Sequence, residues 1–465
     1  MRNLFIIILF SVVSCADPVS HKQNEKPFNF IHPSGEHIQF WMYKDRELIL
    51  LGGSKEDNLF QIPDLEEHLD LLRSVGGNYV RNTMSSRDSG NVWPFIQQEN
   101  GTYNLKIWND EYWNRFDRFL KLTGERDIIV QLEVWATFDF YQENWDKNPF
   151  NPVNNINYDE RRSKLPIKVE THPVYTENNF FRTVPEQMGI AIVLDYQRKF
   201  VDKLLSYSLE YDHVIYCMDN ETSVTADWGE FWSEYIKKKA IEKRKTVYTT
   251  EMWDPWDLSH PFHDETFNHP EIYGFVDISQ NNHITGEEHW NNGLEQLQRL
   301  RSNNALRPVN NVKVYGNDGG RHQTTRNGIE SFIQNIFMGC AGSRFHRPAS
   351  GQGLNEIAQA VVKSMRMLTD SMNWFDGLPD NDLLVNREEH EAYCRVIKGK
   401  EYAIYFPDGG EIGLDLTFYK KSFKIQWLDA LKSEWQEAET IKGGDIILIK
   451  SPGSGHWIAL LKSDR

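Results

Sequence analysis

The sequence is short of cysteine and of positive charge, and both shortages exclude classes of function. Of its 465 residues only 4 are Cys, and none shows Cys-x-x-Cys spacing, so neither a disulfide framework nor a zinc site is expected. Lys and Arg number 51 against 67 Asp and Glu, a formal net charge of −16. This balance argues against nucleic acid or an anionic membrane surface as the main partner.

The N-terminus reads "MRNLFIIILFSVVSCADPVS", a basic start followed by an apolar run too short to cross a bilayer. Its ending before Cys15 resembles the bacterial lipoprotein signal, in which cleavage precedes a lipidated Cys. We expect a signal peptide at 1–14, a tether at 15–29 and an exported lipoprotein, anchored to the outer membrane only through Cys15. The alternative is an ordinary secretory signal with an incidental Cys.

Strand-like and helix-like segments alternate after the tether, which predicts a (β/α)8 TIM barrel over 30–378. The expected strands are 46–53, 78–84, 127–135, 213–221, 246–253, 274–283, 312–320 and 340–348. The expected helices are 63–77, 109–124, 190–210, 228–243, 287–302, 326–338 and 355–372. The alternative, a doubly wound open sheet, is disfavoured because no Gly-x-Gly-x-x-Gly loop follows an early strand.

From about residue 379 the pattern changes to short strands separated by Gly, Pro and Asp turns. No stretch of helical period interrupts them up to the end at 465. This predicts a small antiparallel β-sandwich over 379–465, packed against the barrel because no low-complexity linker separates the two.

Polar residues recur at the C-terminal ends of the predicted strands, where a barrel carries its active site. The candidates are Arg81, Glu133, Trp135, Asn220, Glu221, Glu251, Trp253, His283, Asp318, Arg344 and His346. Glu221 directly follows a buried strand, where a carboxyl is partly desolvated and suited to proton transfer. Hydrolysis of a glycosidic bond needs two carboxyl groups, and Asp318, across the mouth, is the expected partner. The alternatives are a helix cap at Asn220-Glu221 and a turn Asp before Gly319.

Aromatic residues gather in the loops after strands and suit a sugar, which has an apolar face and a polar rim. They are Trp93, Trp135, Phe138, Tyr141, Trp145, Trp253 and Trp256. Arginines also gather there, which suggests a uronic or sulfated sugar, although they would equally serve as structural ion pairs. They are Arg81, Arg87, Arg321, Arg326, Arg344 and Arg347.

The chain resembles clan A glycoside hydrolases, the retaining glycosidases built on a (β/α)8 barrel. Asn220-Glu221 matches the Asn-Glu pair that ends strand four of that clan, in which the Glu is the acid/base residue. Arg81 matches an Arg on strand two, and His283 suits a position on strand six that lines the site. The β-domain ending in "SPGSGHWIALLK" is similar to that of apiosidase-like bacterial glycosidases, whose terminal module is called collagen-binding-like. The resemblance implies a monomeric enzyme acting on oligosaccharides or polysaccharides without a cofactor.

One departure from the clan concerns the nucleophile. In the clan it is a Glu at the end of strand seven, whereas the seventh predicted strand of this chain ends in "YGNDGG", which offers only Asp318. Asp318 would attack, or would hold a water if the enzyme inverts. The partner carboxylate would otherwise be Glu133 or Glu251. The remaining alternative is a barrel that binds glycans without cleaving them. A metal-dependent hydrolase is disfavoured because the candidate ligands His283, His322 and His346 lack a metal-binding spacing.

Overall fold

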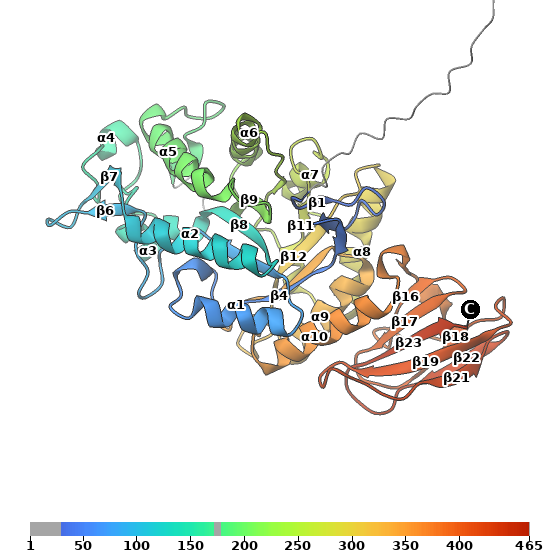
Figure 1. Ribbon diagram of the computed structural model, residues 1–465. Helices are drawn as coiled ribbons and strands as arrows, with labels where there is room; N and C mark the ends of the chain where they lie inside the picture. Colours follow the sequence, from blue (N-terminus) through green and yellow to red (C-terminus); the bar gives the residue numbers. More distant parts are fainter. Residues whose placement is uncertain (1–28, 172–177, 465) are drawn as a thin grey trace, which may run out of the picture.

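The computed structural model describes residues 29–171 and 178–464, which form a parallel barrel followed by a pair of antiparallel sheets (Figure 1). The predicted signal peptide, Cys15 and nearly all of the predicted tether lie outside the described residues. Within the described part of the chain, no helix has both the length and the apolar character needed to cross a membrane.

Eight parallel strands form the barrel, as predicted, in the order β10-β9-β8-β5-β4-β13-β12-β11. They are β4 (Leu50–Gly53), β5 (Tyr79–Thr83), β8 (Ile129–Ala136), β9 (Val214–Asn220), β10 (Thr249–Thr250), β11 (Val276–Asp277), β12 (Val309–Val314) and β13 (Gly342–Phe345). The first strand pairs with the last, Leu50 opposite Gly342. The seam lies between β10 and β11, which share no strand pairing in the described residues.

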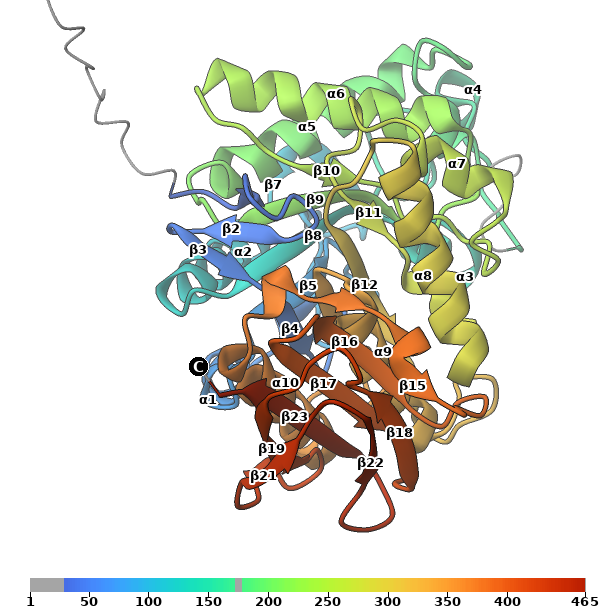
Figure 2. The ribbon, with the colours of Figure 1, turned by 90° about the vertical axis from the view of Figure 1, so that its right-hand side faces the viewer.

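Helices surround the strands, as Figure 2 shows. The main ones are α1 (Leu65–Ser74), α2 (Asp110–Glu125), α5 (Ala191–Ser208), α6 (Ala226–Glu242), α7 (Pro261–Phe267), α8 (Gly286–Ser302), α9 (Thr325–Met338) and α10 (Glu356–Ser371). Their apolar spacing buries one face, as in α1, where Leu65, Leu69 and Leu72 are buried. The Asn109 side chain caps α2 by accepting a hydrogen bond from the Glu111 amide.

A small sheet ahead of the barrel closes its N-terminal end. It consists of β1 (His32–Pro33), β2 (Trp41–Tyr43) and β3 (Arg46–Leu48). The buried Trp41 indole donates to Asn310 Oδ1 at 3.2 Å, at the start of β12. The single strand predicted at 46–53 is therefore wrong: β3 and β4 belong to different sheets and are separated by Ile49.

The loops contain elements that periodicity did not predict, because each is too short to establish a pattern. After β5 comes a hairpin of β6 (Phe95–Gln97) and β7 (Tyr103–Trp108), and after β8 come α3 (Gln142–Lys147) and α4 (Glu160–Ser163). Short 3-10 helices are η1 (Leu59–Gln61), η2 (Thr137–Phe140), η3 (Asn179–Arg182), η4 (Ser279–His283), η5 (Trp374–Asp376) and η6 (Asn381–Leu383). The predicted strand at 274–283 is accordingly wrong beyond Asp277, where β11 ends and η4 follows from Ser279.

Two antiparallel sheets follow the barrel and enclose their own apolar core, as expected for a β-sandwich. Their strands are β14 (Leu378–Pro379), β15 (Leu384–Val385), β16 (Tyr393–Ile397), β17 (Glu401–Phe406), β18 (Glu411–Asp415), β19 (Ser422–Asp429), β20 (Glu434–Trp435), β21 (Glu439–Lys442), β22 (Ile446–Lys450) and β23 (Trp457–Ser463). The sandwich lies beside α9 and α10 (Figure 1). Tyr405 and Leu460 share a buried cluster with Phe337 of α9, so the two units are packed together.

Candidate active site

A cavity of about 760 Å³ opens at the C-terminal ends of the barrel strands. Each strand, or the loop that follows it, contributes at least one lining side chain. In chain order these are Asp57, Arg81, Phe138, Glu221, Asp254, Gln280, Lys313 and His346. Charged groups, amides and aromatic rings converge there, as in a small-molecule site. The cavity thus lies where the strand-end pattern predicted it.

Glu221 lies at the wall of this cavity, directly after β9, and is 7% exposed. Its φ of 55° places its backbone in the left-handed region. Its carboxylate forms an ion pair with the ammonium of Lys313, which comes from β12 on the far side of the mouth. Burial lowers the pKa of Lys313 and the negative charge of Glu221 opposes that effect. Sequence reasoning found Glu221 and missed its cationic partner.

An irregularity in β12 aims Lys313 into the cavity. Asn310 faces the barrel interior, because its amide donates to the Tyr79 hydroxyl at 3.0 Å, and Lys313 faces it too. Regular alternation would send residues three apart to opposite faces. The pairing of β12 with β13 shifts register between Asn311 and Val314, which accommodates one extra residue. Counting alternate residues along the sequence could not reveal this.

Arg81 forms the floor of the cavity, fully buried, and its guanidinium contacts three elements. It donates to Glu133 Oε1 at 2.6 Å, to Asp57 Oδ1 at 2.8 Å and to Asn220 Oδ1 at 2.8 Å. Burial raises the pKa of Glu133, and the charge of Arg81 opposes it. Burial also acts to raise the pKa of Asp57, but the charges of Arg81 and Arg347 and a hydrogen bond with His346 hold it well below its usual range.

His346 extends the same network. Its Nε2 lies 3.2 Å from Asp57 Oδ1 and 3.0 Å from Arg81 Nη1, and its Nδ1 is hydrogen-bonded to the Ser350 hydroxyl. Burial lowers the pKa of His346 to about 3, so the imidazole is neutral at physiological pH. A neutral ring in this position organises the floor without adding charge to it.

Tyr315 stands at the centre of three histidine rings. The ring centroids of His283, His322 and His346 lie 5.6, 5.0 and 5.5 Å from that of Tyr315. All four residues line the cavity, so His283 and His346 occur where they were predicted. The described residues contain no group of three His, Cys, Asp or Glu side chains arranged to hold a metal ion.

Asp254 supplies a second carboxyl group to the cavity, and sequence reasoning did not select it. Its amide donates to Thr222 O at 2.8 Å, and the Thr222 amide donates to Met252 O at 2.9 Å. These bonds continue the β9–β10 pairing and bring Asp254 to the edge that carries Glu221. Burial, with the charge of Glu221, raises the pKa of Asp254 to about 6. The sequence contains a signal for it, because Asp254 directly follows the predicted strand 246–253.

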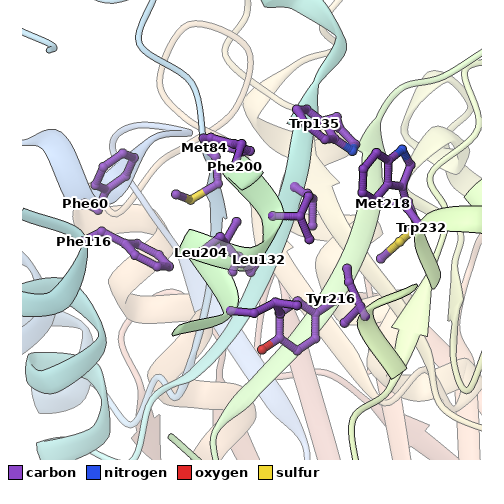
Figure 3. Close-up of a cluster of buried hydrophobic side chains, with 14 of the residues drawn as sticks. Phe60, Met84, Phe116, Leu132, Trp135, Phe200, Leu204, Tyr216, Met218 and Trp232 are labelled. Atoms are coloured by element: carbon purple, nitrogen blue, oxygen red, sulfur yellow. The ribbon is translucent and has the colours of Figure 1, made fainter. Parts of the chain in front are cut away.

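Three of the predicted aromatic residues line the cavity, namely Phe138, Tyr141 and Trp256. Trp135 does not; the expectation that it binds substrate is wrong. Its ring lies 5.3 Å from both Phe200 and Trp232, inside the apolar layer between sheet and helices (Figure 3). Burial of so large an apolar ring stabilises the fold instead.

Four further residues expected in the site lie beneath or beside it. Glu133 is buried below the cavity on Arg81. Glu251 is buried and accepts hydrogen bonds from the Asp219 amide at 2.8 Å and the Met252 amide at 3.0 Å. The Trp253 indole donates to Thr266 Oγ1 at 2.8 Å. Arg344 donates to Val312 O at 2.7 Å and to the Ser54 hydroxyl. These positions support the strand ends and do not line the cavity.

Asp318 lies outside the cavity, so the expected pairing with Glu221 across the mouth is wrong. Its exposed carboxylate accepts hydrogen bonds from the Thr325 amide at 2.7 Å and the Thr325 hydroxyl at 2.5 Å, which lower its pKa. β12 ends at Val314, and Gly316, with φ 137°, then packs against Gly328 of α9. That close approach leads the chain outward before Asp318 is reached.

The arginines divide into paired and unpaired groups. Arg87 Nη2 and Arg347 Nε lie 3.2 and 3.1 Å from Asp57 Oδ2, and each guanidinium also pairs with a second carboxylate, that of Asp139 for Arg87 and that of Glu56 for Arg347. Arg326 lies away from the cavity, with Nε 2.7 Å from Glu330 Oε1. Arg321 lines the rim, where it is exposed and makes no ion pair with any described residue.

Comparisons with known proteins bear on the fold. No family model matches the chain, and no curated protein matches it. A solved glycoside hydrolase superposes with a TM-score of 0.64 at 11% identity, over 93% of this chain and 97% of that one. A glycoside hydrolase family 5 protein from Bacteroides vulgatus ATCC 8482 gives 0.63 at 11% identity, over 93% of both chains. A family 5 mannosidase from Rhizomucor miehei gives 0.50 at 12% identity, over 73% of this chain and 97% of that one. At such identities the likeness establishes the fold, a TIM barrel with a C-terminal β-domain.

Proposed function

We propose that the protein is a glycoside hydrolase that cleaves an O-glycosidic bond in the cavity at the barrel mouth. The observation that carries this proposal is a pair of carboxyl groups, Glu221 and Asp254, that share the cavity in opposite electrostatic environments. Glycosidases need two such groups, one protonated and one ionised. The glycoside hydrolases with the same fold add support.

The environments suggest a role for each carboxyl group. The ammonium of Lys313 favours the ionised form of Glu221, which suits a nucleophile or a base that activates water. The pKa of Asp254, about 6, keeps a proton available near neutral pH for the leaving oxygen. Glu221 would then not be the proton donor that the resemblance to clan A implied, because a cation from strand seven lies where that clan has a second carboxylate.

The lining favours a neutral glycan as the substrate. Phe138, Tyr141 and Trp256 offer apolar faces beside amides such as Gln280 and Asn144. The cavity carries as many Lys and Arg as Asp and Glu side chains. An anionic sugar would therefore find no excess of positive charge, and among the arginines of the wall two are already engaged by Asp57.

A second candidate function is glycan binding without hydrolysis. It is favoured by Lys313, because the ion pair with its ammonium occupies the carboxylate of Glu221. In this reading the barrel retains the sugar-binding wall, and Glu221 accepts hydrogen bonds from hydroxyl groups without transferring protons.

Hydrolysis assays on neutral mannose-, glucose-, galactose- and xylose-based oligosaccharides test the choice. A glycosidase should release reducing ends, and its rate should fall as pH rises through about 6, because Asp254 loses its proton there. Asp254→Asn should lower kcat about a hundredfold or more and remove that alkaline limb. Binding without any release of reducing ends would instead establish the second candidate.

We further propose that the protein is an exported lipoprotein anchored through Cys15, supported by the N-terminal sequence. Cys15→Ser should abolish incorporation of radiolabelled palmitate and release the protein from the membrane fraction. An unlabelled wild-type protein would contradict the proposal.

A further inference from the structure

A second hollow, which we call the outer groove, adjoins the active-site cavity and shares Trp256 with it. The groove has a volume of about 360 Å³. Besides Trp256 it is lined by Asp257, Ile284, residues of α8 and, from the C-terminal domain, Glu389. The Trp256 indole therefore stands between the two hollows and contributes to both.

Trp256 is unusually exposed for a tryptophan, at 58%. The other tryptophans of the strand-end loops are buried or half-buried, as Trp145 and Trp253 illustrate. An exposed indole between two concave surfaces offers its apolar face to a ligand, and sugars present a matching face of C–H groups. Ile284 adds a half-buried apolar side chain to the same wall.

The opposite wall of the groove is polar and comes from one face of α8. Glu288, Asn292 and Glu295 follow at helical spacing, with Asn291 beside them, and all four line the groove. Among the described residues, no cation forms an ion pair with the groove carboxylates of Asp257, Glu288, Glu295 or Glu389. Asp257 Oδ1 already accepts hydrogen bonds from the Ser259 amide and hydroxyl, at 2.9 and 2.7 Å. The carboxylates of Glu288, Glu295 and Glu389 remain available to hydroxyl groups of a ligand, and all four repel anions.

We propose that the outer groove binds a further, uncharged sugar unit of the same oligosaccharide, stacked on Trp256 and hydrogen-bonded to Asn291, Glu288 and Glu295. The inference rests on the proposed function only in taking the main cavity as the sugar site. It implies that the ligand is longer than a disaccharide, and that uronate or sulfate groups are excluded from the unit beyond Trp256. It also gives the C-terminal domain a part in recognition, through Glu389.

The test compares affinity along chain-length ladders, from disaccharide to hexasaccharide, of neutral mannose-, glucose-, galactose- and xylose-based oligosaccharides. Titration calorimetry on the full chain, in a Glu221→Gln background to prevent turnover, measures binding of each length. In the Asn291→Ala/Glu295→Ala double variant, affinity for the longer chains should fall about tenfold or more, whereas affinity for the disaccharide should stay the same. Gln298→Ala, an exposed α8 position outside the groove, is the matched control.

An anionic ladder of oligogalacturonides completes the experiment and should show no gain in affinity with length. The proposal is overturned if the double variant loses affinity equally at every length or at none, if no neutral ladder binds, or if the anionic ladder gains with length. Length-dependent binding without hydrolysis by the wild type would defeat the glycosidase proposal and leave the outer groove standing. Hydrolysis by the wild type together with an affinity that does not change with chain length would leave the glycosidase proposal standing and defeat the outer groove.

Discussion

Glu221 and Asp318 are both carboxylates that follow barrel strands, and both have left-handed backbones, with φ of 55° and 60°. Glu221 is buried at the mouth of the barrel against Lys313. Asp318 is exposed on the outside, where it holds the first residue of α9. The difference lies in the path of the chain: Glu221 comes immediately after β9, whereas the chain between β12 and Asp318 packs Gly316 against Gly328 of α9.

The comparison teaches that the path of the loop decides whether a polar residue after a strand enters the site. Asp57 and Asp254 also lie four residues beyond their strands, yet both line the cavity. At the end of β12, Lys313 and Tyr315 face the cavity. The Gly316–Gly328 contact then leads the chain outward at Asp318, before Arg321 and His322 return to the cavity. Two segments that look alike in the sequence thus place one carboxylate in the cavity and the other at the start of a helix.

The strongest test of the contrast is Glu221→Gln. Removing the ionisable group should lower kcat about a thousandfold or more, because the glutamine neither attacks nor takes a proton. Assays of kcat on the best neutral oligosaccharide measure this, with calorimetry to show that binding persists. A variant with more than a tenth of wild-type kcat would remove Glu221 from the proposed chemistry.

Arg81→Met tests how far the floor beneath Glu221 depends on one cation. The substitution leaves Asp57 and Glu133 buried without their shared partner, so the free energy of unfolding should fall by about 3–5 kcal/mol. Urea denaturation followed by tryptophan fluorescence measures the loss. Arg118→Met, an exposed arginine on α2, is the control, and an equal loss in both variants would contradict the argument.

Lys313→Met removes the cation that distinguishes Glu221 from Asp318. Glu221 should then protonate at higher pH, and the pKa of Asp254 should rise further, because Lys313 acts to lower it. The whole pH–rate profile should therefore move to higher pH, with a loss of about tenfold or more on its acidic side. Lys313→Arg keeps the charge and should restore the pH–rate profile of the wild type. If the profile of Lys313→Met does not shift, the ion pair does not control the protonation of the two carboxyl groups.

Asp318→Asn should have the smallest effect. The amide still accepts a hydrogen bond from the Thr325 amide, so kcat should stay within about twofold of wild type. Thermal denaturation should reveal only a slight decrease in Tm. A kcat as low as that of Glu221→Gln would return Asp318 to the active site and overturn the comparison.

Sequence reasoning predicted the barrel because eight apolar strands interleaved with seven amphipathic helices make a long and regular signal. It also predicted the ends of strands that stop abruptly, and so placed Arg81, Asn220, Glu221 and His346 at the cavity. His283 reaches the cavity as well, but from η4 and not from the strand that was predicted there. Trp135, Glu251 and Arg344 were misplaced because a polar or aromatic residue at a strand end can also point into the protein.

What the sequence determined by itself is the order of the elements and the end of the barrel at which polar groups collect, since both follow from local periodicity. Only the tertiary structure decided which groups meet there. The register shift in β12 turns Lys313 inward, the backbone pairing of Thr222 with Met252 and Asp254 brings Asp254 to Glu221, and the contact between Gly316 and Gly328 leads Asp318 away. Each depends on contacts between residues distant along the chain, which a local pattern does not encode.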